Sequence, residues 1–159
     1  MKKPRVMFLT GIITGILISM AIVYLMAPKL MFTVSESQYD FETTKTMIEE
    51  STKNNQWSMP HQYNLQATME KHGFNVEPVT VFSICKPDIA IKILGDDTNK
   101  HISAMMPCRL AIYEKEDGKT YIARMNAALL SKLIGSEVNA VMGEAGAGSE
   151  KILEKVIKQ

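Results

Sequence analysis

Two short runs on either side of Asp117-Gly118 decide the fold: RLAIYE at 109–114 and KTYIARM at 119–125. Both runs are rich in the β-branched, aromatic and aliphatic residues that are typical of strands. An aspartate-glycine pair is a strong signal for a tight turn between two antiparallel strands, because glycine readily adopts a positive φ. We therefore predict a β-hairpin at the centre of a sheet.

The predicted hairpin also indicates which side chains lie next to each other. A symmetric turn centred on Asp117-Gly118 would pair Leu110 with Met125. Cys108 lies two residues before Leu110, and side chains two residues apart project from the same face of a strand. This register predicts that Cys108 and Met125 are near neighbours.

The flanking segments contain apolar residues at helical or strand spacing. The helix at 64–71 is expected to bury Leu65, Thr68 and Met69, and Gly95 is expected to end the following helix in a left-handed conformation. Helices interspersed with strands indicate an α+β fold, in which helices cover one face of a small, mostly antiparallel sheet. The predicted helices are 40–54, 64–71, 89–94, 127–134 and one beginning at Ser149, the further strands are 30–35 and 76–84, and 143–148 is a flexible glycine-alanine linker.

A membrane-spanning segment is predicted before this domain. Residues 6–26 read VMFLTGIITGILISMAIVYLM and contain no charge. As a helix they would extend roughly 31 Å, which matches the hydrocarbon core of a bilayer. The run is longer than the apolar region of a signal peptide and is followed by no small-x-small cleavage site, so we expect an anchor that remains in the lipid bilayer.

Basic residues predict the orientation of this anchor. Lys2, Lys3 and Arg5 precede the apolar run and only Lys29 follows it closely, so residues 1–5 should lie in the cytoplasm. The domain would then lie on the periplasmic or extracellular side of the cell (inner) membrane. Gly11 and Gly15 have the spacing that lets two membrane helices pair, although chance spacing explains them equally well.

The charge of the remaining chain argues against a nucleic-acid partner. Of the 18 Lys and Arg residues, four lie before the domain, which leaves 14 basic residues against 17 acidic ones. Nucleic-acid binding needs clustered Lys and Arg to displace counterions from phosphates. A mildly acidic domain without a basic run does not meet this requirement.

Several motifs, in order along the chain, resemble the domain of unknown function 302 family. They are CKP at 85–87, MPCRLAIYE at 106–114, DGKTYI at 117–122 and MN at 125–126. The resemblance extends over about 31–142, the predicted globular domain, and leaves 143–159 as a linker and an amphipathic helix. It implies a compact α+β domain that forms a homodimer in bacteria or archaea. It implies no reaction.

The sulfur-containing residues are the candidates for a ligand or redox site. Cys85 precedes a predicted helix, where the helix dipole and Lys86 would favour a thiolate. A pocket formed by Cys85, Cys108, Met106 and Met125, which His101 would join, would suit Cu(I) or another soft metal. A disulfide between the two cysteines and ordinary packing are the alternatives.

The sequence contains no CxxC, HExxH or GxSxG motif, and we predict no catalytic residue. The expected function is a membrane-anchored, noncatalytic module that binds a ligand or a protein and forms homodimers. The alternatives are a thiol-dependent redox or soft-metal protein, and an accessory subunit of a membrane complex.

Overall fold

The computed structural model describes residues 3–133 and 135–158. It divides into two compact units, Met1–Met31 and Phe32–Gln159. The first unit contains helix α1 (Lys3–Met31), in which Thr10–Ala27 are long and apolar enough to cross a membrane and are not buried inside the protein. The strand predicted to begin at residue 30 begins at Phe32, because α1 continues to Met31.

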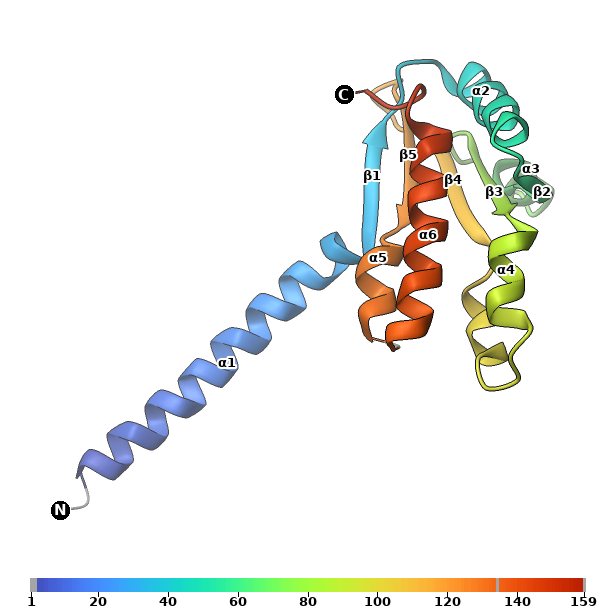
Figure 1. Cartoon of the computed structure of the whole chain (residues 1–159). Helices are drawn as coiled ribbons and strands as arrows, with labels where there is room; N and C mark the ends of the chain where they lie inside the picture. The colour runs from blue at the N-terminus through green and yellow to red at the C-terminus, as the bar shows by residue number, and fades with distance from the viewer. Residues whose placement is uncertain (1–2, 134, 159) are drawn as a thin grey trace. The chain divides into compact units, whose positions relative to one another are not determined.

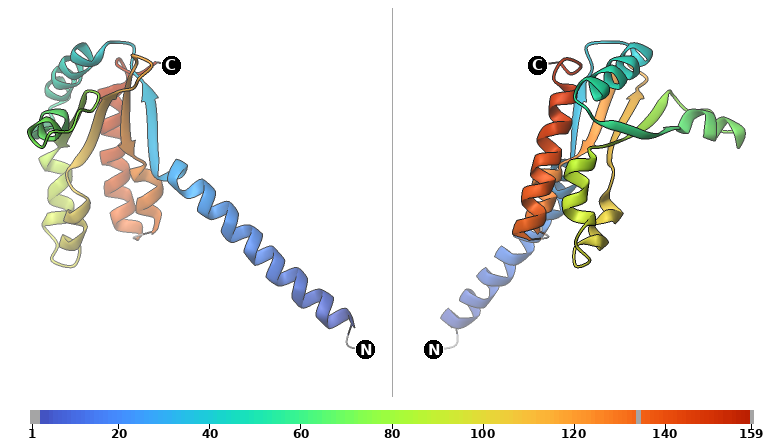
Figure 2. Two further views of the ribbon diagram at one scale, coloured as in Figure 1. Left: turned by 180° about the vertical axis from the view of Figure 1, so that it is seen from behind. Right: turned by 45° about the vertical axis from the view of Figure 1, so that its right-hand side comes forward.

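The second unit has two layers, with helices on one face of a five-stranded sheet (Figures 1 and 2). Every neighbouring pair of strands is antiparallel, and the order is β1-β5-β4-β3-β2. This confirms the predicted α+β fold. The strands are β1 (Phe32–Glu36), β2 (Ser58–Asn64), β3 (Val79–Cys85), β4 (Cys108–Glu114) and β5 (Thr120–Met125).

Three helices cover the sheet, while α3 projects from its β2 edge (Figure 2). The first of them starts where Asp40 accepts a 2.9 Å hydrogen bond from the Thr43 backbone N–H, as expected for an N-cap aspartate. The covering helices are α2 (Phe41–Asn54), α4 (Pro87–Leu94) and α6 (Ser136–Leu153). The shorter elements are α3 (Leu65–Lys71), α5 (Ala127–Leu130) and the 3₁₀ helices η1 (Lys100–Met105) and η2 (Ser131–Leu133).

The core lies between the sheet and α2 and α6. Alternate side chains of the central strands point toward the helices, as the two-residue period of a strand requires. The largest fully buried side chains from the sheet are Phe82, Ile84, Leu110, Ile112 and Ile122. Those from the helical layer are Ile48, Ile93, Ile152 and Leu153, together with Val156, which follows α6.

The hairpin is present, but its predicted register is wrong by one residue. Gly118 has a φ of 70°, and its N–H donates to the Lys115 carbonyl at 2.9 Å, so the turn contains three residues instead of two. Leu110 consequently pairs with Arg124. A shift of one residue moves a side chain to the other face of a sheet, so Met125 projects from the face opposite Cys108.

The predicted glycine-alanine linker is a continuous part of α6. A Cβ atom on Gly148 would lie 2.5 Å from Cζ2 of Trp57, so glycine at this position allows the indole to pack directly against the helix backbone. Ser149 does not cap a helix, because its hydroxyl donates to the Gly146 carbonyl at 2.8 Å inside α6. Close packing explains Gly148 and the buried Ala145, whereas nothing lies within 4 Å of a Cβ atom on Gly143.

The other differences lie near the edge of the sheet and at helix ends. β2 was not predicted, because it is a polar edge strand that contains Pro60 and pairs only with β3. The α3 helix has no buried residue, so Leu65 and Thr68 are exposed. Gly95 has a φ of −75° and is not left-handed. The helix predicted at 127–134 divides into α5 and η2, and residue 134 lies outside the described residues.

Candidate functional site

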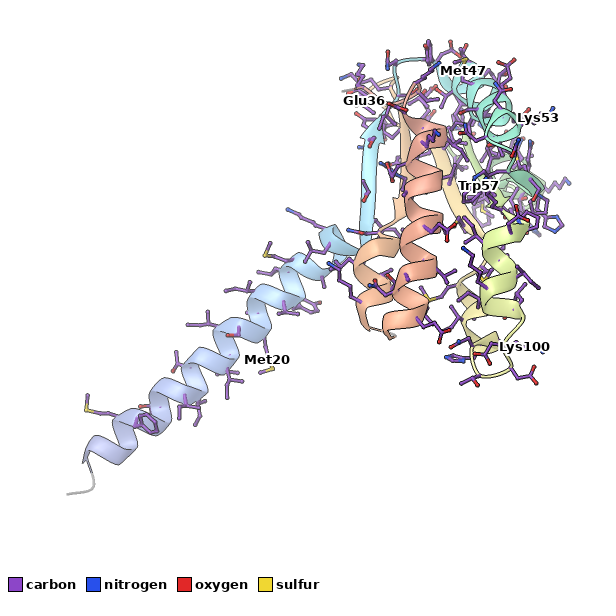
Figure 3. All side chains as sticks on the ribbon, viewed as in Figure 1. Met20, Glu36, Met47, Lys53, Trp57 and Lys100 are labelled. Atoms are coloured by element: carbon purple, nitrogen blue, oxygen red, sulfur yellow. The ribbon has the colours of Figure 1, made fainter. Side chains whose placement is uncertain are left out.

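A pocket lies on the helix-covered side of the sheet, between α4 and α6. Its cavity volume is about 30 Å³. Trp57, which lies beside α6 in Figure 3, forms part of its wall. Its lining is Trp57, Ile84, Cys85, Lys86, Ile89, Ala90, Ile93, Met105, Met106, Pro107, Cys108, Val141, Met142 and Ala145.

Sulfur is concentrated in this lining. Five of the fourteen lining residues contain sulfur, compared with fourteen of the 159 residues in the chain. General use of methionine therefore does not explain the lining. We call the pocket the sulfur pocket, after Cys85, Cys108, Met105, Met106 and Met142.

The sheet register places both cysteines at one end of the central strands. Cys108 begins β4 opposite Ile84, and Cys85 ends β3 one residue further along. The Cys108 side chain packs against the core, on the side of Ile84. Cys85 lines the same pocket from the last position of β3. A disulfide needs Cβ atoms that point toward each other, and both cysteines are free thiols in the structure.

The three methionines come from two other elements. Met105 ends η1 and Met106 follows it, whereas Met142 lies on α6. All three belong to or pack against a cluster that includes Ile93 and Ile102. Met142 was not predicted as a site residue. The predicted linker at 143–148 interrupts the helical spacing of Val138, Met142 and Ala145, which lie on one helix, α6.

Burial determines the acidity of both thiols. Burial raises the pKa of both Cys85 and Cys108. A negative charge on Cys85 raises the pKa of Cys108 further. The lowered pKa predicted for Cys85 is therefore wrong, because loss of hydration outweighs the helix dipole and Lys86. Both residues are thiols at neutral pH, when neither is a strong nucleophile.

The other predicted site residues lie outside the sulfur pocket. Met125 and Cys108 line a neighbouring pocket that also includes Met105 and Met142. His101 is exposed in η1, with Nδ1 3.0 Å from the Thr98 carbonyl oxygen, and lines neither pocket. Within 3–133 and 135–158, no three His, Cys, Asp or Glu side chains gather in a way that could hold a metal ion.

The uncovered side of the sheet is a second notable surface, which we call the bare face (Figure 2, left). One row of side chains crosses all five strands: Val34, Ala123, Ala111, Val81 and Tyr63. Val34 is 50% exposed and Tyr63 40%, and next to this row Phe32 is 53% and Met125 36% exposed. The row across the bare face is therefore apolar, and its most exposed side chains lie on the edge strands β1 and β2.

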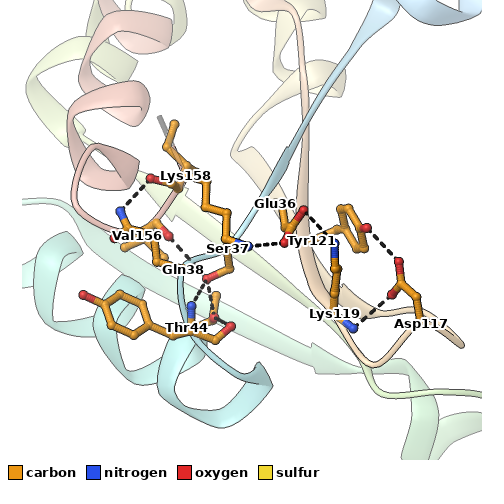
Figure 4. Close-up of polar contacts among 11 residues, drawn as sticks. Glu36, Ser37, Gln38, Thr44, Asp117, Lys119, Tyr121, Val156 and Lys158 are labelled. Atoms are coloured by element: carbon orange, nitrogen blue, oxygen red, sulfur yellow. Dashed lines mark hydrogen bonds and ion pairs between the residues drawn. The ribbon is translucent and has the colours of Figure 1, made fainter.

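Polar contacts close the end of the sheet where the chain terminates (Figure 4). Lys158 and Lys119 form ion pairs with Glu36, and the hydrogen bond from Lys158 is the main cause of its lowered pKa. Buried Ser37 lies 2.7 Å from the Thr44 hydroxyl and pairs with Ile157 in an isolated bridge. These contacts fix the chain terminus to β1, which is a structural role.

The turn of the hairpin contains another carboxyl group with a lowered pKa. The Asp117 carboxylate accepts a hydrogen bond from the Lys119 backbone N–H at 3.0 Å and one from the Tyr121 hydroxyl at 2.9 Å (Figure 4). The backbone hydrogen bond is the main cause of its lowered pKa. Because these contacts shape the turn, they do not indicate an acid or base catalyst.

These features define a small two-layer α+β domain with one bare sheet face and a sulfur-containing pocket under its helices. Residues 32–158 match the family described as "Domain of unknown function DUF302". The chain belongs to this family, and the match continues sixteen residues beyond the predicted limit at 142, through α6 to the chain terminus.

A solved structure supports the fold. The chain is similar to the uncharacterized conserved protein DUF302 from Bacillus stearothermophilus, whose crystal structure it matches with a TM-score of 0.71 and 17% identity. The match covers 79% of this chain and 98% of that one. No curated protein matches the sequence.

Proposed function

We propose that this protein is a membrane-anchored, noncatalytic interaction module that pairs with a second copy of itself through the bare face. The apolar row across the bare face is the observation on which this proposal rests. A solvated face of an antiparallel sheet ordinarily carries polar side chains, and exposed apolar patches on soluble domains commonly mark interaction sites.

The distribution of side-chain sizes favours a second copy as the partner. Ala111 and Ala123 lie side by side at the centre of the bare face, whereas the larger Phe32 and Tyr63 lie toward opposite edges. Small central residues allow two sheets to approach to the usual separation of about 10 Å. A two-fold axis near the alanines would bring identical patches together, as an isologous dimer requires.

The N-terminal helix supports the same proposal. Apolar α1 would hold the protein in the bilayer, with residues 1–5 in the cytoplasm and the domain on the periplasmic or extracellular side. Confinement to one membrane raises the effective concentration of the second copy. Gly11 and Gly15 would permit close helix contact, because glycine has no side chain and the two residues have GxxxG spacing.

The test is the oligomeric state of the full chain in detergent, measured by sedimentation over a range of concentrations. We expect a dimer that Ala123→Lys weakens by at least about tenfold, because a lysine at the centre of the interface would be desolvated. Ala147→Lys, on the exposed side of α6, is the matched control and should leave the dimer unchanged.

A monomer at every concentration would overturn the proposal, as would equal effects of the two lysine variants. If a different protein co-purifies in fixed stoichiometry and Ala123→Lys releases it, the bare face serves a membrane complex instead. That result would favour the accessory-subunit alternative and contradict self-association.

A further inference from the structure

We propose that the sulfur pocket binds one Cu(I) ion, with the Cys108 thiolate and thioethers from Met105, Met106 and Met142 as ligands. This inference does not depend on self-association, because the pocket lies on the helix-covered side of the sheet and the bare face lies on the other.

The donor types select the metal. The lining contains no carboxylate and no imidazole, so it offers none of the side-chain oxygen ligands that Ca²⁺ and Mg²⁺ require. Structural zinc sites use thiolates and imidazoles in a closed tetrahedron, and a single thiolate with thioethers does not supply one. Soft thiolate and thioether sulfurs favour Cu(I).

Charge balance identifies the thiolate. One thiolate neutralises Cu(I), so the complex of Cys108 and thioethers carries no net charge into an apolar pocket. A second thiolate from Cys85 would leave a buried negative charge, which is costly unless it is paired. Lys86 is the only charged residue in the lining. We assign Cys108, which packs against the core, as the single anionic ligand.

The positions of the methionines suit a site that closes around its ion. Met105 and Met106 come from η1 on one side of the pocket, and Met142 comes from α6 on the other. Methionine has three rotatable side-chain bonds, so its sulfur can move without a shift of the backbone. A bound ion would connect η1 to α6 and stabilise the folded domain.

The binding step exchanges a proton for the metal and involves no electron transfer. Cys108 enters as a neutral thiol, its S–H bond breaks, a copper–sulfur bond forms and the proton passes to solvent. Because one proton is released for each ion bound, the apparent affinity should increase about tenfold for each unit of pH in the neutral range.

The experiment is an anaerobic titration of the full chain in detergent with Cu(I), in competition with bicinchoninate. We expect one equivalent to bind, and Cys108→Ser to lower the affinity by at least about 100-fold because it removes the anionic ligand. Met106→Leu preserves the side-chain volume and should lower the affinity by about tenfold. Met47→Leu, which changes a methionine of α2 outside the pocket, is the control and should change the affinity by less than about threefold.

Each contrary result has a defined meaning. Absence of stoichiometric Cu(I) binding overturns the proposal, and so does equal loss of affinity in Met106→Leu and Met47→Leu. An increase of about 100-fold per pH unit would require two thiolates and would overturn the assignment of Cys108 alone. If Cys108→Ser does not fold, the pH dependence and the methionine pair still decide the question.

Discussion

A single missing side chain at Gly148 determines how Trp57 is packed. The indole occupies the space that a Cβ atom would need, at 2.5 Å from Cζ2 and 3.3 Å from Cε2. Trp57 is 7% exposed, lines the sulfur pocket and is the only tryptophan in the chain. This residue therefore connects helix packing to the shape of the candidate site.

We predict that Gly148→Ala destabilises the folded domain by about 1–3 kcal/mol, because the new methyl group overlaps the indole. Gly143→Ala in the same helix is the control: nothing lies within 4 Å of its added Cβ atom, so higher helix propensity should stabilise the protein by up to about 1 kcal/mol. Denaturant titrations followed by Trp57 fluorescence measure both changes. Stabilisation by both substitutions would contradict the packing argument.

The buried thiol of Cys108 predicts a pH dependence. Burial raises its pKa above the ordinary value of 9.0, so the thiol form stabilises the folded state. That contribution is complete below the pKa of the unfolded chain and is lost as the pH rises through the folded value.

The measurement is the free energy of unfolding of Cys85→Ser and of the double variant Cys85→Ser/Cys108→Ala as a function of pH. The contributions of all other titrating groups cancel in the difference between the two variants. The difference between their free energies of unfolding should become smaller above pH 9.0. A difference that grows with pH would mean that the folded protein stabilises a thiolate at Cys108.

At the scale of elements, one ion pair attaches α6 to the sheet. Arg124 of β5 is 7% exposed and forms two hydrogen bonds with Glu150, at 2.5 and 2.6 Å, and a third with the Ser35 hydroxyl at 3.1 Å. The Glu150 side chain is 50% exposed. The two partners therefore differ in how easily each could be hydrated alone.

This difference predicts unequal effects of removing either partner. Glu150→Gln leaves the buried guanidinium without its anion and should cost about 1–3 kcal/mol of stability. Arg124→Met leaves a half-exposed carboxylate that water can solvate, so its cost should be smaller, at less than about 1 kcal/mol. Thermal unfolding of the two variants tests the order, and a larger loss for Arg124→Met would contradict it.

The sequence predicts an element well where its signal is local. The hairpin strands, α2, and α4 after Pro87 follow from turn chemistry and periodicity. β2 and the glycine-containing part of α6 cannot be predicted from local signals, because partners distant in the sequence hold each of them in place. β2 pairs with β3, and Gly148 packs against Trp57. Tertiary packing overrides local propensity at both places.

The candidate site was also only partly predicted, because some of its residues are brought together by contacts between distant parts of the chain. Cys85, Cys108 and Met106 line one pocket, as their residue types suggested. The predicted pairing of Leu110 with Met125 was wrong, because a three-residue turn cannot be distinguished from a two-residue turn by Asp117-Gly118 alone. Met125 and Cys108 nevertheless line one pocket beside the sulfur pocket. Met142 reaches the pocket through the fold of α6, which no local motif indicates.

At the scale of the whole domain, the bare face and the sulfur pocket lie on opposite sides of the sheet. The bare face is available to a second copy while the sulfur pocket remains on the other side of the sheet. Self-association and metal binding are therefore separable properties. Ala123→Lys, which should weaken the dimer, should leave the affinity for Cu(I) unchanged.

Membrane topology is the remaining property of the whole chain. If α1 is an uncleaved anchor with its N-terminus in the cytoplasm, protease added outside spheroplasts should digest the domain while the intact chain stays with the membrane at high pH. Replacing Lys2, Lys3 and Arg5 by glutamine and adding lysines after residue 29 should reverse the orientation, because basic residues near the segment ends determine it. The control adds the same number of lysines at exposed positions of α6, far from the segment in sequence. A mature protein that begins after residue 26 would instead show that the apolar run is a cleaved signal.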